Sequence, residues 1–121
     1  MTLKECYAAM GSDYDDVMGR LRTERIVQKF VLKFADDKSF ELLQKSLEEQ
    51  NYEEAFRAAH TIKGVCQNLS LTKLGASSSA LSEALRGGSW SGEAAALAEQ
   101  TAKDYKETIS AIRAFQEALG G

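Results

Sequence analysis

The chain contains a single histidine, His60, within the segment AAHTIKGVCQNL (residues 58–69). Lys63 and Gly64 follow it at about one helical turn. An imidazole nitrogen can act as a nucleophile and form a covalent intermediate. A nearby ammonium group favours the neutral, nucleophilic ring and can later pair with a phosphoryl group on it. Zinc needs three or four ligands, and the chain has no second histidine, so we expect no metal site here.

A helical wheel separates the histidine from the apolar side of its helix. At about 100° per residue, a polar group of residues falls within roughly 60° of His60: Glu53, Arg57, Lys63, Gly64 and Gln67. The far side carries small and apolar residues: Ala55, Ala59, Ile62, Cys66 and Leu69. We therefore expect His60 to face solvent or a partner rather than the core.

Gly64 is unusual because a glycine inside a helix costs about 1 kcal/mol relative to alanine. Close packing of another helix is one explanation, but Gly64 shares the polar face with His60. We expect it to give a partner room beside the imidazole. Gln67 could donate a hydrogen bond to phosphoryl oxygens, or could be an ordinary surface glutamine.

Phe56 lies one turn before His60, beside the polar face. We predict that Phe56 and Arg57 belong to a partner-docking surface, because aromatic residues dominate interface hot spots. The alternative for Phe56 is a place at the rim of the core, folded over a neighbouring helix.

Helical periodicity extends over most of the chain, and no segment alternates with period two. Expected N-caps are Asp13, Thr23, Asn51 (with Glu54, as in a capping box) and Thr72, and a further helix begins at Ser39. Gly87 and Gly88 should end the helix that follows Thr72, with Arg86 in its last turn. The last helix should run from about Gly92 to Leu119.

Three of these helices have an expected apolar side. In the helix that follows Thr23, the apolar side comprises Ile26, Val27, Phe30, Val31 and Phe34. After Ser39 it comprises Phe40, Leu43 and Leu47, and in the last helix Ala98, Tyr105, Ile109, Ile112 and Leu119. Short connections between amphipathic helices predict an all-α fold. We expect an antiparallel up-and-down four-helix bundle over about 23–119, with one or more short N-terminal helices in an extension over 1–22, as one domain over 1–121.

Composition narrows the function classes. The 121-residue chain has no proline, and this fits an all-helical chain because proline breaks helix interiors. Its formal net charge of −3 argues against a nucleic-acid partner, since a phosphate backbone favours a basic face. No apolar run approaches the ~20 residues of a membrane span, and the N-terminus does not resemble a secretory signal. Cys6 and Cys66 lack metal-ligand spacing and are expected to be reduced thiols, so we predict a cytoplasmic protein.

The segment HTIKG, with NL downstream, resembles the His-x-x-Lys-Gly motif of histidine-containing phosphotransfer (HPt) domains, and the similarity extends from about Thr23 to Leu119. The resemblance implies a helical bundle in which His60 accepts a phosphoryl group through Nε2. It also implies that Lys63 is the phosphate-side cation and Gly64 the clearance residue. Where the family often has glycine after NL, this chain has Ser70, which affects the local turn more than the chemistry.

The implied function is a phosphorelay carrier that passes a phosphoryl group to or from an aspartate of a response-regulator receiver domain. A sensor histidine kinase or hybrid kinase is a further candidate partner. The sequence lacks a glycine-rich phosphate loop, so we expect no ATP site and no cofactor of its own, with Mg²⁺ supplied by the receiver.

Two alternatives stay open: a helical adaptor that only binds proteins, and the phosphoacceptor domain of a larger chemotaxis-type kinase. The initial methionine and the linker-free C-terminal EALGG favour a free-standing protein over the second.

Overall fold

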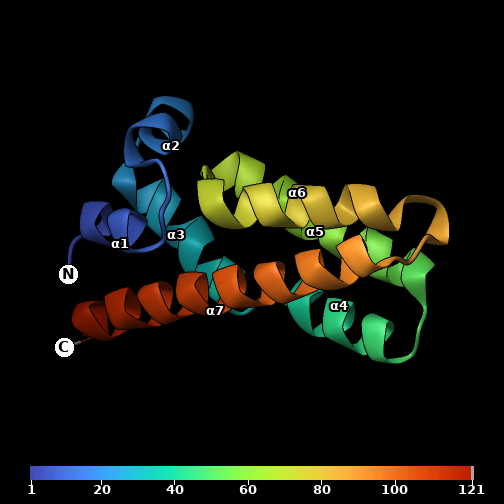
Figure 1. Ribbon diagram of the computed structural model, residues 1–121. Helices are drawn as coiled ribbons and strands as arrows, with labels where there is room; N and C mark the ends of the chain where they lie inside the picture. The colour runs from blue at the N-terminus through green and yellow to red at the C-terminus, as the bar shows by residue number, and fades with distance from the viewer. Residues whose placement is uncertain (121) are drawn as a thin grey trace.

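The computed structural model describes residues 1–120, and all its regular elements are helical (Figure 1). This confirms the expected all-α bundle. The helices are α1 (Leu3–Ala9), α2 (Tyr14–Leu21), α3 (Glu24–Ala35), α4 (Ser39–Glu48), α5 (Tyr52–Leu69), α6 (Thr72–Leu85), the 3₁₀ turn η1 (Arg86–Gly88) and α7 (Gly92–Gly120).

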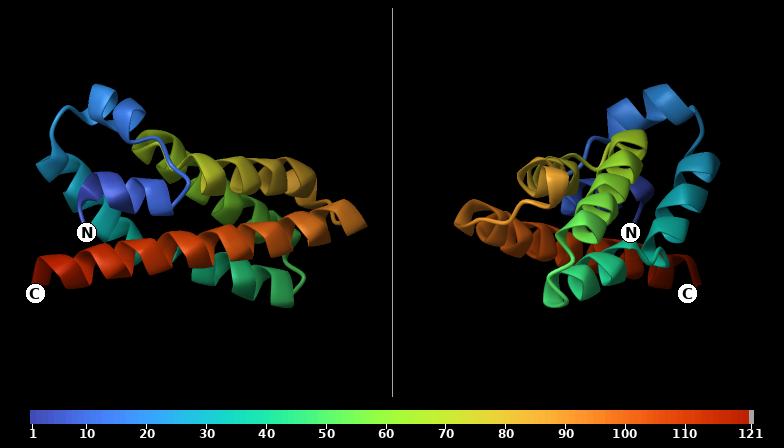
Figure 2. Two further views of the ribbon diagram at one scale, coloured as in Figure 1. Left: turned by 60° about the vertical axis from the view of Figure 1, so that its left-hand side comes forward. Right: turned by 90° about the vertical axis from the view of Figure 1, so that its right-hand side faces the viewer.

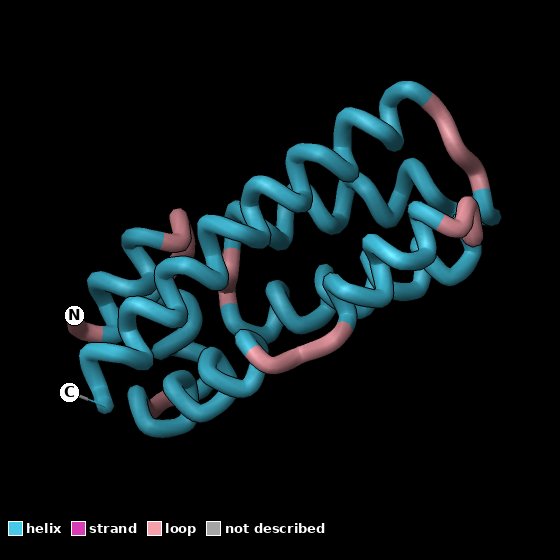
Figure 3. Tube along the Cα trace, turned by 90° about the horizontal axis from the view of Figure 1, so that it is seen from below, coloured by secondary structure: helices cyan, strands magenta, loops and turns pink. Residues whose placement is uncertain are grey.

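The bundle is built around α5, which packs against both α4 and α6. The long α7 runs along the molecule and contacts α1, α3 and α6. Helices α3 and α4 follow one another with a bend between them, so together they form one interrupted side of the bundle (Figures 1 and 2). Figure 3 shows the same helices from below, joined by loops. Successive reversals after α4, α5 and α6 give the antiparallel order.

Side-chain caps fix several helix starts where the sequence predicts them. The carboxylate of Asp13 accepts a hydrogen bond from the amide of Asp16, and the hydroxyl of Thr23 accepts one from the amide of Ile26. Asn51 Oδ1 accepts one from the amide of Glu54 at 3.2 Å. The prediction for Thr72 is wrong, because the N-cap is Leu71, which has no polar side chain to cap with.

The short helices α1 and α2 lie together at the end of the bundle that carries both termini (Figure 2). Their side chains reach the core: Cys6, Tyr7 and Val17 are fully buried. The Tyr7 hydroxyl donates a hydrogen bond to the carbonyl of Leu69, the last residue of α5, at 2.8 Å. The N-terminal segment is therefore part of the packed structure.

Two predicted core residues of α3 lie at the surface. Ile26 is 41% exposed and Phe30 is 37% exposed, whereas Val27, Val31 and Phe34 are buried as expected. Helix α3 lies at the edge of the bundle, and the side on which Ile26 and Phe30 lie is only partly covered by α5.

The predicted apolar side of α7 is also partly wrong. Leu119 is 48% exposed, while Ala98, Tyr105 and Ile109 are only half-buried. The buried line includes polar residues and comprises Ala94, Thr101, Asp104, Thr108, Ala111, Ile112 and Phe115. On α4, Phe40 and Leu43 are buried as predicted, but Leu47 is half-buried.

Candidate functional site

Helix α5 presents His60 on its outer face. The residues expected on the inner face, which include Ala55, Ile62 and Leu69, are all buried. His60 is exposed and Lys63 is half-buried on the side that faces α6. The wheel prediction is thus confirmed for the orientation of the histidine, and the site is an open surface rather than a cleft.

Gly64 has open space around it. Among the described residues, no heavy atom outside the neighbouring backbone lies within 4 Å of the position that a Cβ of Gly64 would occupy. Gly75 on α6 is different, because a Cβ there would lie 3.2 Å from Cβ of Cys66. Helix packing therefore explains Gly75 but not Gly64, which is available to admit an approaching group.

Across from the polar face of α5, the end of α6 carries a charged pair. Glu83 accepts hydrogen bonds from Nε and Nη2 of Arg86, at 3.0 and 2.9 Å. The pKa of Glu83 is lowered, first by this hydrogen bonding and the Arg86 charge, with a smaller contribution from the charge of Lys63.

Phe56 lies between His60 and Arg86. Its ring is stacked with the imidazole, with centroids 5.8 Å apart and planes at 23°. The guanidinium carbon of Arg86 lies over the same phenyl ring, 5.4 Å from its centroid. Phe56 is half-buried, so it takes part in both the rim of the core and the exposed surface.

Arg57 and Gln67 complete the predicted site residues, and both are exposed. Arg57 forms an ion pair with Glu54 on its own helix. The backbone carbonyl of Gln67 accepts a hydrogen bond from Arg20 of α2. Both side chains lie on the outer face as the wheel predicts, and their functional roles stay predictions.

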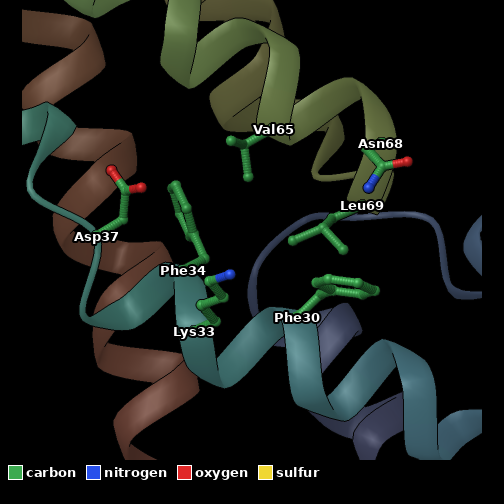
Figure 4. A pocket seen from close by; sticks show the side chains of 7 residues that line it. All are labelled: Phe30, Lys33, Phe34, Asp37, Val65, Asn68 and Leu69. Atoms are coloured by element: carbon green, nitrogen blue, oxygen red, sulfur yellow. The ribbon is translucent and has the colours of Figure 1, made fainter.

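Sequence reasoning missed a pocket beside this face. A pocket of about 200 Å³ lies between α3 and α5 and is mostly apolar (Figure 4). Its lining residues are Phe30, Lys33, Phe34, Asp37, Val65, Asn68 and Leu69. Asn68 follows Gly64 by one helical turn, so the pocket adjoins the open surface at Gly64.

Sequence reasoning also missed Glu83 and Arg86 as neighbours of the site. Their spacing of three residues on a helix is a readable ion-pair signal. The spacing does not show which other helix lies opposite Glu83 and Arg86. The exposure of Phe30 could not be predicted, because Phe30 occupies the same position in the helical repeat as an ordinary core residue.

Residues 1–120 hold no cluster of three or more histidine, cysteine or acidic side chains that could bind a metal ion. Within the same range, no helix has both the length and the apolar character needed to cross a membrane.

Comparison with known families gives one match: the family model described as "Hpt domain" matches residues 25–117 of this chain. The match includes α5 and all the predicted site residues, and it begins after α1 and α2. Searches of curated proteins and of solved structures gave no match.

Proposed function

Because the chain belongs to the Hpt domain family of phosphotransfer domains in two-component signalling, we propose that His60 carries the phosphoryl group. The observation that carries this proposal is the exposed imidazole with Lys63 and the open position at Gly64 on one face of α5. This arrangement gives a nucleophile, a cation and space for a second protein in one place.

In the proposed reaction, the lone pair of His60 Nε2 attacks the phosphorus of an aspartyl phosphate. The bond between phosphorus and the carboxylate oxygen breaks, a P–N bond forms, and the aspartate leaves as a carboxylate. The reverse reaction returns the phosphoryl group. Lys63 pairs with the phosphoryl oxygens, and Gln67, further along the same face, donates a hydrogen bond to them.

The proposed partner is a response-regulator receiver domain, with a sensor kinase or hybrid kinase as the upstream source of phosphate. Mg²⁺ enters with the receiver, whose carboxylates supply the oxygen ligands that this ion prefers. The apolar surface formed by Phe30 and the adjoining pocket supports docking over the α3–α5 side, because apolar and aromatic residues form the centre of such interfaces. Phe56 and Arg57 extend the docking surface on the other side of His60.

We expect this reaction to take place in the cytoplasm. Both thiols, Cys6 and Cys66, are buried and unpaired in the structure, as in proteins of a reducing compartment. The pKa of Cys6 is raised to about 11 and that of Cys66 to about 12 by burial, so neither thiol competes with His60 as a nucleophile.

The test uses receiver domains charged with acetyl phosphate in the presence of Mg²⁺. The protein should gain phosphate that is labile in acid and stable in alkali, and a variant with His60→Gln should gain none. If several receivers are charged and the wild-type protein takes phosphate from none of them while still binding one, the adaptor function replaces the carrier function.

A further inference from the structure

The imidazole of His60 has an aromatic neighbour that sets its surroundings on one side. The ring of Phe56 is stacked with it at a centroid separation of 5.8 Å and an interplanar angle of 23°. The separation lies within the range of favourable aromatic pairs, and the small angle makes the arrangement a stacked one. A histidine on an exposed helix face otherwise rotates about two side-chain bonds, so a stacked ring restricts the directions in which its nitrogens point.

Phe56 is itself contacted by a residue of η1, the turn that follows α6. The guanidinium of Arg86 lies over its ring at 5.4 Å, within the distance of a cation–π contact. Glu83 fixes the same guanidinium with two hydrogen bonds, at 2.9 and 3.0 Å. The carboxylate, the guanidinium, the phenyl ring and the imidazole therefore form a continuous series from α6 to the reactive nitrogen.

The turn after α6 determines where Arg86 lies. Arg86 begins η1, and Gly87 and Gly88 that follow have φ values of +70° and +78°, which favour glycine. A Cβ at Gly88 would lie 3.2 Å from Cγ of Glu53 on α5, so the turn approaches the first turns of α5 closely. The backbone thus brings Arg86 to the side chain of Phe56.

We propose that Phe56 and Arg86 are positioning residues that hold the imidazole of His60 in the orientation needed for phosphoryl transfer. The proposal rests on the function proposed above, and it assigns to Phe56 a role beyond docking. Holding a nucleophile in one orientation removes the rotational freedom that would otherwise be lost at the transition state. Glu83 supports this arrangement through Arg86.

The test uses phosphoramidate, a small phosphodonor that needs no docking surface. Nε2 or Nδ1 of His60 attacks its phosphorus, the P–N bond of the donor breaks, and ammonia leaves. Phe56→Leu removes the aromatic ring and should make this reaction roughly three- to tenfold slower. The share of the Nδ1 isomer, measured by NMR of the phosphorylated ring, should rise. Phe56→Tyr should restore both values.

The lone histidine gives a second measurement that does not depend on phosphate. Its ring protons form one isolated set of NMR signals, which Phe56→Leu should shift because the phenyl ring current is lost. Arg86→Met should shift the same signals less and slow phosphorylation less, and Arg86→Lys should recover part of the loss because it keeps the cation.

Matched controls are Phe40→Leu, which removes a ring stacked on Tyr105 rather than on His60, and Arg25→Met, at an exposed arginine of α3. Neither should change the isomer ratio or the rate with phosphoramidate. An unchanged isomer ratio and rate in Phe56→Leu would overturn the proposal, and so would an equal loss in Phe40→Leu. If receivers do not phosphorylate the wild-type protein but the isomer ratio still depends on Phe56, the relay function fails while the positioning role stands.

Discussion

The C-terminal end of α5 and its central face are held in different ways. At the C-terminal end, Tyr7 donates to the carbonyl of Leu69 at 2.8 Å, and Arg20 donates to the carbonyl of Asn68 at 3.1 Å. The hydroxyl of Ser70 donates to Asp16 at 2.6 Å. Helices α1 and α2 therefore bind the end of α5 with a network of hydrogen bonds.

On the central face, His60 and Gly64 are exposed. The imidazole of His60 is stacked with the ring of Phe56. The comparison indicates that the C-terminal end of α5 and its central face serve different purposes. The end of α5 is fixed by contacts with α1 and α2, and its centre is open, as the proposed reaction with another protein requires. Substitutions at the two places should consequently affect different measurements.

The largest effect should come from His60→Gln. Phosphate acceptance should be abolished, because the nucleophilic nitrogen is lost. The free energy of unfolding should change by less than about 0.5 kcal/mol, because the side chain is exposed. Phosphate uptake and chemical denaturation measure the two effects. Continued uptake of alkali-stable phosphate by this variant would refute the assignment of His60.

The next effect concerns the open position at Gly64. Gly64→Gln should fold well, since glutamine is a good helix former, yet it should slow transfer from a receiver by about a hundredfold because its side chain stands where the partner approaches. Gly64→Ala should stabilise the fold by up to about 1 kcal/mol and disturb transfer moderately.

Gly75→Ala is the matched control for these variants. The new methyl group would meet Cβ of Cys66 at 3.2 Å, and this atom cannot move without shifting α5 against α6. We expect Gly75→Ala to lower the melting temperature, in contrast to Gly64→Ala. If both Gly64 variants are strongly destabilised, Gly64 is a packing residue and the clearance interpretation is wrong.

The central face could be predicted from the sequence because it depends on one helix only. Periodicity places His60, Lys63 and Gly64 together and opposite Ile62 and Leu69, whatever the neighbouring helices do. Contacts between helices could not be predicted in this way. The contact of Arg86 with Phe56 depends on the backbone turn at Gly87 and Gly88.

The buried side of α7 shows a second reason why part of the structure could not be predicted from the sequence. Thr101 and Thr108 are buried because their hydroxyls donate to carbonyls of the same helix, Leu97 and Asp104, at 2.8 Å each. Asp104 is buried as well; it accepts a hydrogen bond from Gln100 at 2.9 Å, and its charge is paired with Lys73 of α6, whose Nζ lies 3.9 Å from Oδ1. Polar groups satisfied within their own helix can enter the core, so a pattern of apolar residues alone misses them.

The third prediction tests the fixed end of α5. Tyr7→Phe removes the hydroxyl that donates to the carbonyl of Leu69 and leaves this buried acceptor without that partner. The free energy of unfolding should fall by about 1 to 2 kcal/mol. The rate of phosphorylation by phosphoramidate should stay unchanged, because His60 lies away from this end. A parallel loss of rate would show that the two parts of α5 are not independent.

A smaller effect is expected from Lys63→Ala. In the proposed reaction the Lys63 charge assists transfer by pairing with phosphoryl oxygens, and the nucleophile of His60 remains in this variant. Transfer should therefore slow several-fold and the phosphorylated form should decay faster, while acceptance persists. The comparison should be made at low ionic strength, where exposed charges are least screened. An unchanged rate there would show that the Lys63 charge has no part in the reaction.

The smallest net effect is expected at Ser70. Its backbone has φ +56° and ψ +38°, a left-handed conformation that costs a residue other than glycine about 1 kcal/mol. In compensation, its hydroxyl donates to Asp16 at 2.6 Å and accepts from Arg20 at 3.2 Å. Ser70→Gly should relieve the strain and lose these bonds, so the free energy of unfolding should change little.

Ser70→Ala loses the hydroxyl but keeps the left-handed strain, so it should be about 1 kcal/mol less stable than Ser70→Gly. The contribution of the backbone strain and that of the hydroxyl's hydrogen bonds can be separated in a second parent chain. In a chain carrying Arg20→Met and Asp16→Asn, the hydroxyl of Ser70 loses its charged partners, and Ser70→Gly should then stabilise the fold. If Ser70→Gly is equally neutral in both parent chains, neither the bonds to α2 nor the left-handed strain at Ser70 contributes measurably to stability. The serine would then have no stabilising advantage over glycine at this turn.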